Sequence, residues 1–157
     1  MSLQEIYQEV LLAHNEHPNN FCEMTNASSK AHGHNPLCGD EVSVFLKLCG
    51  NEVNQISFIG QSCAICKSSA SLMTEYLKGK PVDVAKKDAL AFIELLNNPE
   101  KAVSENLGEL EALLGVRKFP ARLKCATLAW HTFLKALDGQ ENGASSASCC
   151  CQRNCGC

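Results

Sequence analysis

The residues best suited to chemistry in this chain are three thiols and one carboxylate: Cys38, Asp40, Cys63 and Cys125. Asp40 follows Cys38 by two residues in a predicted loop, whereas Cys63 and Cys125 stand near the starts of predicted helices. Three cysteines and one aspartate supply four ligands, which is the number that a tetrahedral metal site needs. A thiolate held by a metal can also be released to accept sulfur, so we expect thiol and metal chemistry.

The helical positions of two of these cysteines argue against a simple core role. On an ideal helix, Cys63 and Cys125 each lie roughly 130° from the centre of the apolar stripe of their own helix. Cys63 also stands at a helix start, where unpaired N–H groups and the macrodipole favour a thiolate. Cys38 lies in a loop between Pro36 and Gly39. We therefore interpret these three cysteines as functional.

The other cysteines need separate interpretations, because the chain has eleven and five of them fall in its last nine residues. Cys22 and Cys49 are interpreted as inert core thiols, since nothing around them suggests activation. Cys66 forms a CxxC pair with Cys63, a spacing shared by redox and zinc motifs, but the rest of a thioredoxin pattern is missing. The CxxC spacing alone therefore leaves open whether Cys66 is a functional thiol or an inert core thiol.

Two histidines near Cys38 offer a rival set of ligands. His32 and His34 precede Cys38 by only a few residues, and a loop of cysteine and histidine is a common zinc-binding arrangement. Histidines in polar loops are more often solvated side chains, and that interpretation is favoured here.

Length and composition restrict the class of protein. The 157 residues suit one domain with its own core, and the net charge of −3 without a basic run argues against nucleic-acid binding. No segment approaches the roughly 20 apolar residues of a membrane span. The start of the chain lacks the apolar region of a secretory signal, so the expected compartment is the cytoplasm. Thiols stay reduced there, which favours cysteines as ligands or nucleophiles.

The elements expected from periodicity and turn signals place strands before most helices. A polar, irregular segment over 19–35 has room for one short strand at 21–24. A hairpin is expected over 42–48 and 53–59, and helical segments over 3–14, 62–77, 83–96, 107–114 and 120–137. This order predicts an α+β fold, in which helices pack on one face of a small antiparallel sheet. The expected domain covers 1–138, and a flexible, cysteine-rich C-terminal tail covers 139–157.

Three segments carry a resemblance to a known family. NPLCGDEV, FIGQSCAICKSSASLMTEYLKGK and GVRKFPARLKCATLAW resemble the SufU/IscU family (NifU N-terminal type) of iron–sulfur cluster assembly proteins, specifically its SufU branch. The similarity covers about 3–137 and implies the same α+β fold with one exposed metal site. It implies that the ligands are Cys38, Asp40, Cys63 and Cys125. Lys124 stands where IscU-type scaffolds have a histidine, as it does in the SufU branch.

This resemblance implies a function with one main alternative. The SufU branch implies a zinc-dependent acceptor and carrier of persulfide sulfur, with Cys38 as the acceptor. Its partners would be a PLP-dependent cysteine desulfurase of the SufS type and the downstream iron–sulfur assembly machinery. Such a relay would be sulfurtransferase-like if it counts as an enzyme. The alternative is a scaffold on which a [2Fe–2S]-type cluster is built and transferred without catalysis, with iron or the cluster at the same site. A third interpretation is a purely structural zinc site.

Two features depart from the family pattern. Cys66 stands where the resemblance predicts a serine, so it is a candidate extra ligand or resolving thiol. The cysteine-rich end, Cys149 to Cys157, has no counterpart in the family. A non-essential tail is favoured over metal binding, sulfur carriage or lipidation.

Overall fold

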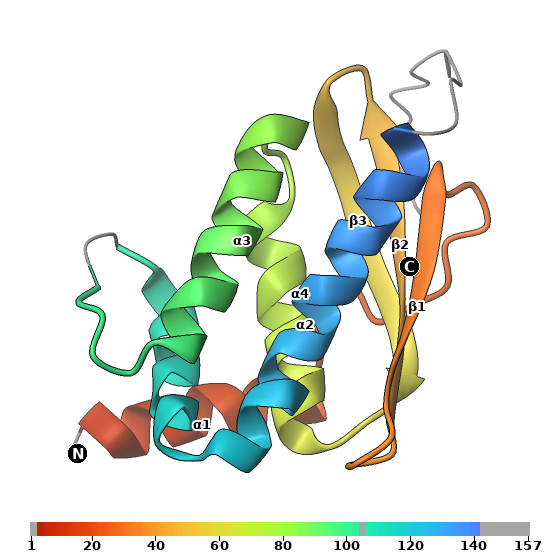
Figure 1. Cartoon of the computed structure of the whole chain (residues 1–157). Helices are drawn as coiled ribbons and strands as arrows, with labels where there is room; N and C mark the ends of the chain where they lie inside the picture. The colour runs from red at the N-terminus through yellow and green to blue at the C-terminus, as the bar shows by residue number, and fades with distance from the viewer. Residues whose placement is uncertain (1–2, 104–105, 142–157) are drawn as a thin grey trace.

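The computed structural model describes residues 3–103 and 106–141 and has the expected α+β architecture (Figure 1). In chain order the elements are α1 (Leu3–Glu16), β1 (Ser29–Asn35), β2 (Asp40–Cys49), β3 (Glu52–Gln61), α2 (Ala64–Leu77), α3 (Val82–Asn97), η1 (Gly108–Lys118) and α4 (Pro120–Glu141). The element η1 is a 3₁₀ helix. α4 extends three residues beyond the predicted domain boundary, and the rest of the predicted tail lies outside the described residues.

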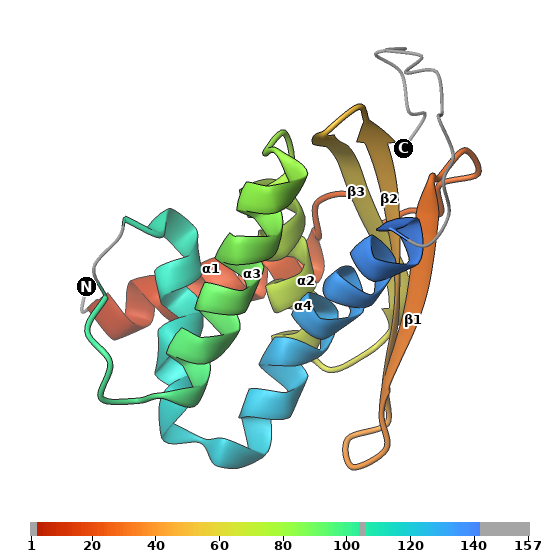
Figure 2. The ribbon, with the colours of Figure 1, turned by 45° about the horizontal axis from the view of Figure 1, so that its top comes forward.

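The sheet is antiparallel in the order β1-β2-β3, and the helices lie on one side of it (Figure 2). Val42, Val44 and Leu46 alternate along β2 and are almost fully buried, as expected for a strand with one face on the core. α4 packs across this face over β1 and β2 (Figures 1 and 2). The predicted fold class and the predicted hairpin are therefore confirmed.

The first strand differs from the sequence expectation. A strand was expected at 21–24, but that segment makes only one bridge, between Phe21 and Phe58. The strand instead covers Ser29–Asn35, within the segment predicted to be mostly irregular. A Cβ on Gly33 would overlap the side chain of Thr132, so the glycine is what allows β1 to lie directly against α4. An edge strand without alternating apolar residues gives no periodic signal.

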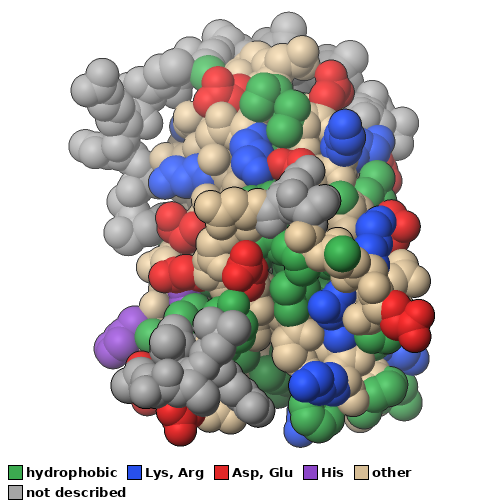
Figure 3. Space-filling view, turned by 90° about the vertical axis from the view of Figure 1, so that its left-hand side faces the viewer, with side chains coloured by type: hydrophobic (Ala, Val, Ile, Leu, Met, Phe, Trp, Pro, Cys, Tyr) green, Lys and Arg blue, Asp and Glu red, His purple; other side chains and the backbone are tan. Residues whose placement is uncertain are grey.

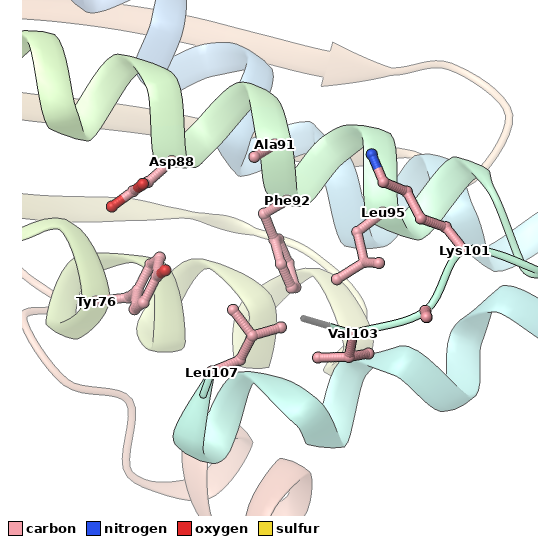
Figure 4. Close-up of a pocket in the computed structure, with 9 residues that line it drawn as sticks. Tyr76, Asp88, Ala91, Phe92, Leu95, Lys101, Val103 and Leu107 are labelled. Atoms are coloured by element: carbon pink, nitrogen blue, oxygen red, sulfur yellow. The ribbon is translucent and has the colours of Figure 1, made fainter. Parts of the chain in front are cut away.

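Trp130 of α4 is the centre of the helical core. Its ring is fully buried, lies 4.4 Å from the ring of Phe92 between centroids, and donates a hydrogen bond from Nε1 to Ser69 Oγ at 2.9 Å. Ser69 Oγ in turn donates to the Ala126 carbonyl. These contacts join α2, α3 and α4 into one packed unit. A small hollow of about 210 Å³ remains beside Tyr76 and Phe92, between α2, α3, residues 101–103 and Leu107 (Figure 4).

Polar contacts attach α1 to the rest of the helices. Buried His14 contacts Ser71 Oγ of α2 through Nδ1 at 2.7 Å and Glu109 of η1 through Nε2 at 2.8 Å. Tyr7 donates a hydrogen bond from its hydroxyl to Glu111 at 3.0 Å. Because these three contacts come from one side of α1, they fix it against α2 and η1.

The molecular surface is mixed in charge on the face shown in Figure 3. Lysine and arginine side chains alternate there with aspartate and glutamate, around hydrophobic side chains that gather toward the middle of the face. A single-sign patch of the kind that binds nucleic acid is not visible on this face. Among the described helices, none has the length and apolar character that crossing a bilayer requires.

Candidate metal centre

The loop that carries Cys38 is fixed at both ends by the sheet. The β1–β2 ladder ends with Asn35 opposite Asp40, so the connection over 36–39 is a tight turn. Asn35 holds this turn twice, because its Oδ1 accepts the Leu37 N–H at 3.2 Å and its carbonyl accepts the Gly39 N–H at 2.9 Å. Gly39 adopts a φ of 70°, which glycine tolerates at no steric cost. Cys38 is exposed at the tip of this turn.

Three of the four candidate ligands form a compact group. One ligand atom from each of Cys38, Asp40 and Cys125 lies within 4.8 Å of the other two, and the two sulfur atoms are 3.3 Å apart. Two thiolates bound to one tetrahedral zinc ion, each at 2.3 Å, would lie about 3.8 Å apart. The group therefore has the dimensions of a metal site, and its thiolate and carboxylate donors suit zinc or iron.

Cys63 stands beside this group and contacts Asp40. Asp40 Oδ1 accepts the Cys63 N–H at 2.8 Å, and Oδ2 is 3.8 Å from the Cys63 sulfur. Cys63 is the N-cap of α2, and its sulfur accepts the N–H of Cys66 at 3.5 Å. The Cys63 sulfur lies outside the compact group of three, but it is near enough to Cys125 to contribute to the raised pKa of that thiol.

Cys125 is fully buried, which the helical-wheel argument did not predict. Cys125 lies off the apolar stripe of α4 and is nevertheless buried, because the β1–β2 turn and buried Asp40 cover that side of the helix. Burial raises the pKa of Cys125, and its hydrogen bonds to Asp40 and Cys38 raise the pKa further. Metal binding at this thiol therefore has to displace a tightly held proton.

Cys66 and the two histidines lie outside the compact group. Cys66 is fully buried, and this burial raises its pKa to about 12, which describes a protonated thiol packed in the core. His32 and His34 are both exposed on β1, and His32 Nδ1 contacts Ser43 Oγ at 3.0 Å. The rival ligand set of cysteine and histidine is not assembled in this structure.

The interpretation of Cys22 and Cys49 as inert core thiols was wrong. Both side chains are half-buried, and both are disulfide-bonded rather than free. Cys22 lies in the segment before β1, and Cys49 is the last residue of β2.

A groove of about 700 Å³ adjoins the candidate site at Cys63. α1, the start of α2, and the stretch from η1 into the start of α4 line it with largely apolar side chains, among them Leu11, Ile65, Val116 and Phe119, and Arg122 stands in its wall. Sequence reasoning missed this groove, since three segments that are distant in the chain form it. Phe119, which lines the groove, is a large apolar side chain that is 61% exposed, and its exposure becomes apparent only in the structure.

Comparison with known proteins places these features in a family. The family described as NifU-like N terminal domain matches residues 6–126. A relative from Bacillus subtilis named zinc-dependent sulfurtransferase SufU is 38% identical over 142 residues, covering 90% of this chain and 96% of the relative. The iron–sulfur cluster assembly scaffold protein IscU of Streptococcus pyogenes is 34% identical over 140 residues, covering 89% and 87%. A solved structure from Fervidobacterium islandicum, assigned to iron–sulfur cluster assembly for the SUF system, superimposes with a TM-score of 0.73 at 29% identity and covers 87% of this chain and 99% of that one.

Proposed function

The chain belongs to the family of NifU-like N-terminal domains, and from that membership we propose that it accepts and carries persulfide sulfur for iron–sulfur cluster assembly in a zinc-dependent manner. The observation that carries the proposal is the contrast within the compact group of ligands. Cys38 is exposed at a loop tip, whereas Asp40 and Cys125 are 1% and 0% exposed. One thiol is therefore accessible to a partner, while its neighbours are held in place.

We assign the metal to Cys38, Asp40, Cys63 and Cys125. Bound zinc would keep these thiols ionised at neutral pH, which offsets the effect of burial on Cys125. Asp40 is the only oxygen ligand of the four, so it would leave a soft metal more easily than the three thiolates. Asp40 also accepts the N–H of Cys63 and so helps to order the start of α2.

The sulfur transfer is an ordinary thiol exchange at Cys38. The Cys38 thiolate attacks the terminal sulfur of a persulfide on the partner, a bond forms between these two sulfurs, and the partner's sulfur–sulfur bond breaks. The partner's cysteine leaves as a thiolate, so no oxidant or reductant is needed. The short turn held by Asn35 keeps Cys38 at an exposed position for this step.

The partner in this proposal is a PLP-dependent cysteine desulfurase of the SufS type, followed by the downstream assembly machinery. Two observations support a protein partner at this end of the molecule. Leu37, next to the acceptor in sequence, is a large apolar side chain exposed to solvent. The groove beside Cys63 is open and largely apolar, as expected of a surface that another protein covers.

A scaffold for a [2Fe–2S]-type cluster is the second candidate, supported by the relative from Streptococcus pyogenes that carries the scaffold name. The same four side chains would hold iron, and Asp40 would be the labile ligand. Anaerobic reconstitution distinguishes the two functions. A scaffold gives a visible absorption band that is lost in Cys63→Ser, whereas a zinc-dependent relay stays colourless with stoichiometric zinc. A purely structural zinc site would unfold the domain on chelation.

The deciding experiment measures cysteine turnover by a desulfurase with and without this protein. The zinc-loaded protein should raise the rate of alanine formation, and Cys38→Ala should abolish that stimulation while retaining its fold. His34→Ala is the matched control, because His34 is exposed on β1 near the same turn but outside the ligand group. Normal stimulation by Cys38→Ala would rule out Cys38 as the acceptor.

A further inference from the structure

The side-chain nitrogen of Asn35 is a buried donor to which the fold gives no role. Its side chain is 6% exposed, and its Nδ2 has no hydrogen-bond partner. Among the described residues, only Ser57 Oγ shares this condition, on the opposite face of the sheet beside Phe45. A buried donor without a partner is unfavourable, so its presence calls for an explanation. The other half of the same amide is already used, since Oδ1 accepts the Leu37 N–H.

The packing of β1 on α4 shows which way Asn35 faces. Ser29 Oγ donates to the Ala136 carbonyl, the position of a Cβ on Gly33 is filled by Thr132 and Leu128, and Cys38 meets Cys125. The contacts thus move down α4 toward its start as β1 advances toward the turn. Asn35 is buried on the same face as Gly33, two residues further on. It therefore faces the part of α4 between Leu128 and Cys125.

The ligands change their hydrogen-bonding needs when a metal binds. Without metal, the Cys125 thiol donates a hydrogen bond to the Cys38 sulfur. A divalent ion replaces the thiol protons, so both sulfurs become acceptors only. Three thiolates and one carboxylate around Zn²⁺ carry a net charge of about −2. The share of that charge on buried Cys125 needs a donor nearby, and the Cys63 N–H is already bonded to Asp40.

We propose that Asn35 is a positioning residue whose side-chain N–H donates a hydrogen bond to the Cys125 thiolate of the metal-loaded site. Its Oδ1 holds the turn that presents Cys38, so one carboxamide sets both the buried and the exposed sulfur ligand. This inference rests on the proposed metal site but not on sulfur transfer. In this proposal Nδ2 gains its hydrogen-bond partner when the metal binds, because the Cys125 thiolate then becomes an anionic acceptor beside it.

Variants at Asn35 separate this role from simple support of the turn. Asn35→Asp and Asn35→Ser keep a side-chain oxygen for the Leu37 N–H, and both remove the amide donor. Ser57→Ala is the matched control, because it removes the other unpartnered buried polar group far from the ligands. The whole 157-residue chain is loaded with Co²⁺, which reports thiolate ligation through its sulfur-to-metal charge-transfer band. Zinc affinity is measured in parallel by competition with a chromophoric chelator.

We expect both Asn35 variants to shift the charge-transfer band to lower energy, because a thiolate without its hydrogen bond is more electron-rich. Zinc affinity should fall by about tenfold or more in both, and Ser57→Ala should match the unmodified protein. Support of the turn alone predicts unchanged spectra in both variants, and that result overturns the inference. If the unmodified protein shows no thiolate band with Co²⁺, the metal site itself is refuted together with this inference. Loss of desulfurase stimulation with an intact cobalt spectrum would instead count against the proposed sulfur transfer alone.

Discussion

Substitutions of Asp40 test the carboxylate that links the candidate ligands to the start of α2. Asp40 is 1% exposed, and its Oδ1 accepts the N–H of Cys63 at 2.8 Å. Asp40→Ala removes this acceptor and leaves a buried N–H without a partner at a helix start. A hydrogen bond to a charged group contributes about 1.5–3 kcal/mol to folding, so we expect the metal-free protein to lose about 2 kcal/mol. For a chain of this size that is a decrease in Tm of roughly 4–8 °C.

Asp40→Asn is the variant that separates the two roles of the carboxylate. Its carbonyl oxygen can still accept the Cys63 N–H, so the metal-free stability should stay within about 1 kcal/mol of the unmodified protein. Zinc affinity should fall in both variants, because an amide oxygen is a poor ligand for zinc compared with a carboxylate. Thermal unfolding of chelator-treated protein and a zinc competition assay measure the two quantities independently.

Two results would refute this reasoning. If Asp40→Asn loses as much metal-free stability as Asp40→Ala, the hydrogen bond to Cys63 is not the stabilising contact. If both variants bind zinc as tightly as the unmodified protein, Asp40 is not a ligand. Asp88→Ala is a useful comparison, since Asp88 also makes a short contact, at 2.6 Å with Lys80, but lies away from the ligand group.

Two further predictions concern packing and pH. Gly33→Ala should destabilise the protein by about 1–3 kcal/mol in urea unfolding, because its methyl group would overlap the Thr132 side chain, and Thr132→Ala in the same chain should restore part of the loss. A fully additive double variant would contradict this contact. The raised pKa of Cys66 means that the native state keeps its proton while the unfolded chain loses it, so the metal-free protein should lose stability as pH rises from about 9 toward 12. Cys66→Ser should flatten this decline in unfolding curves at pH 7 and pH 10, and an unchanged slope would contradict the assignment.

The sequence was sufficient for the elements that have a strong internal pattern. Apolar alternation predicted the hairpin that became β2 and β3, and helical periodicity predicted α2, α3 and α4 within a few residues. The family resemblance from three motifs is confirmed by the match over 6–126. β1 was missed because its inward positions, Gly33 and Asn35, are not apolar, so contact with α4 and not hydrophobic periodicity defines the strand.

The surroundings of the ligands could not be predicted in the same way. A helical wheel describes one helix and its own core, so it placed Cys125 off the core without showing that the turn before β2 covers it. The groove beside Cys63 depends on contacts of Tyr7 and His14 with η1, roughly a hundred residues away in the chain. The local amino-acid composition does not reveal contacts between residues so distant in the chain. The metal and the acceptor role of Cys38 stay predictions that the assays above address.

The missing side chain at Gly33 sets an alignment that reaches well beyond its own position. β1 can pack this closely on α4 only where a residue without a Cβ faces Thr132. This requirement fixes the position of the strand along the helix. A strand advances about 3.3 Å per residue, so a slip of two residues, which preserves the inward face, would carry Cys38 about 6.6 Å along the helix. That displacement exceeds the 4.8 Å span of the ligand group. The spacing between the Cys38 and Cys125 sulfurs thus depends on close packing at Gly33, five residues before Cys38.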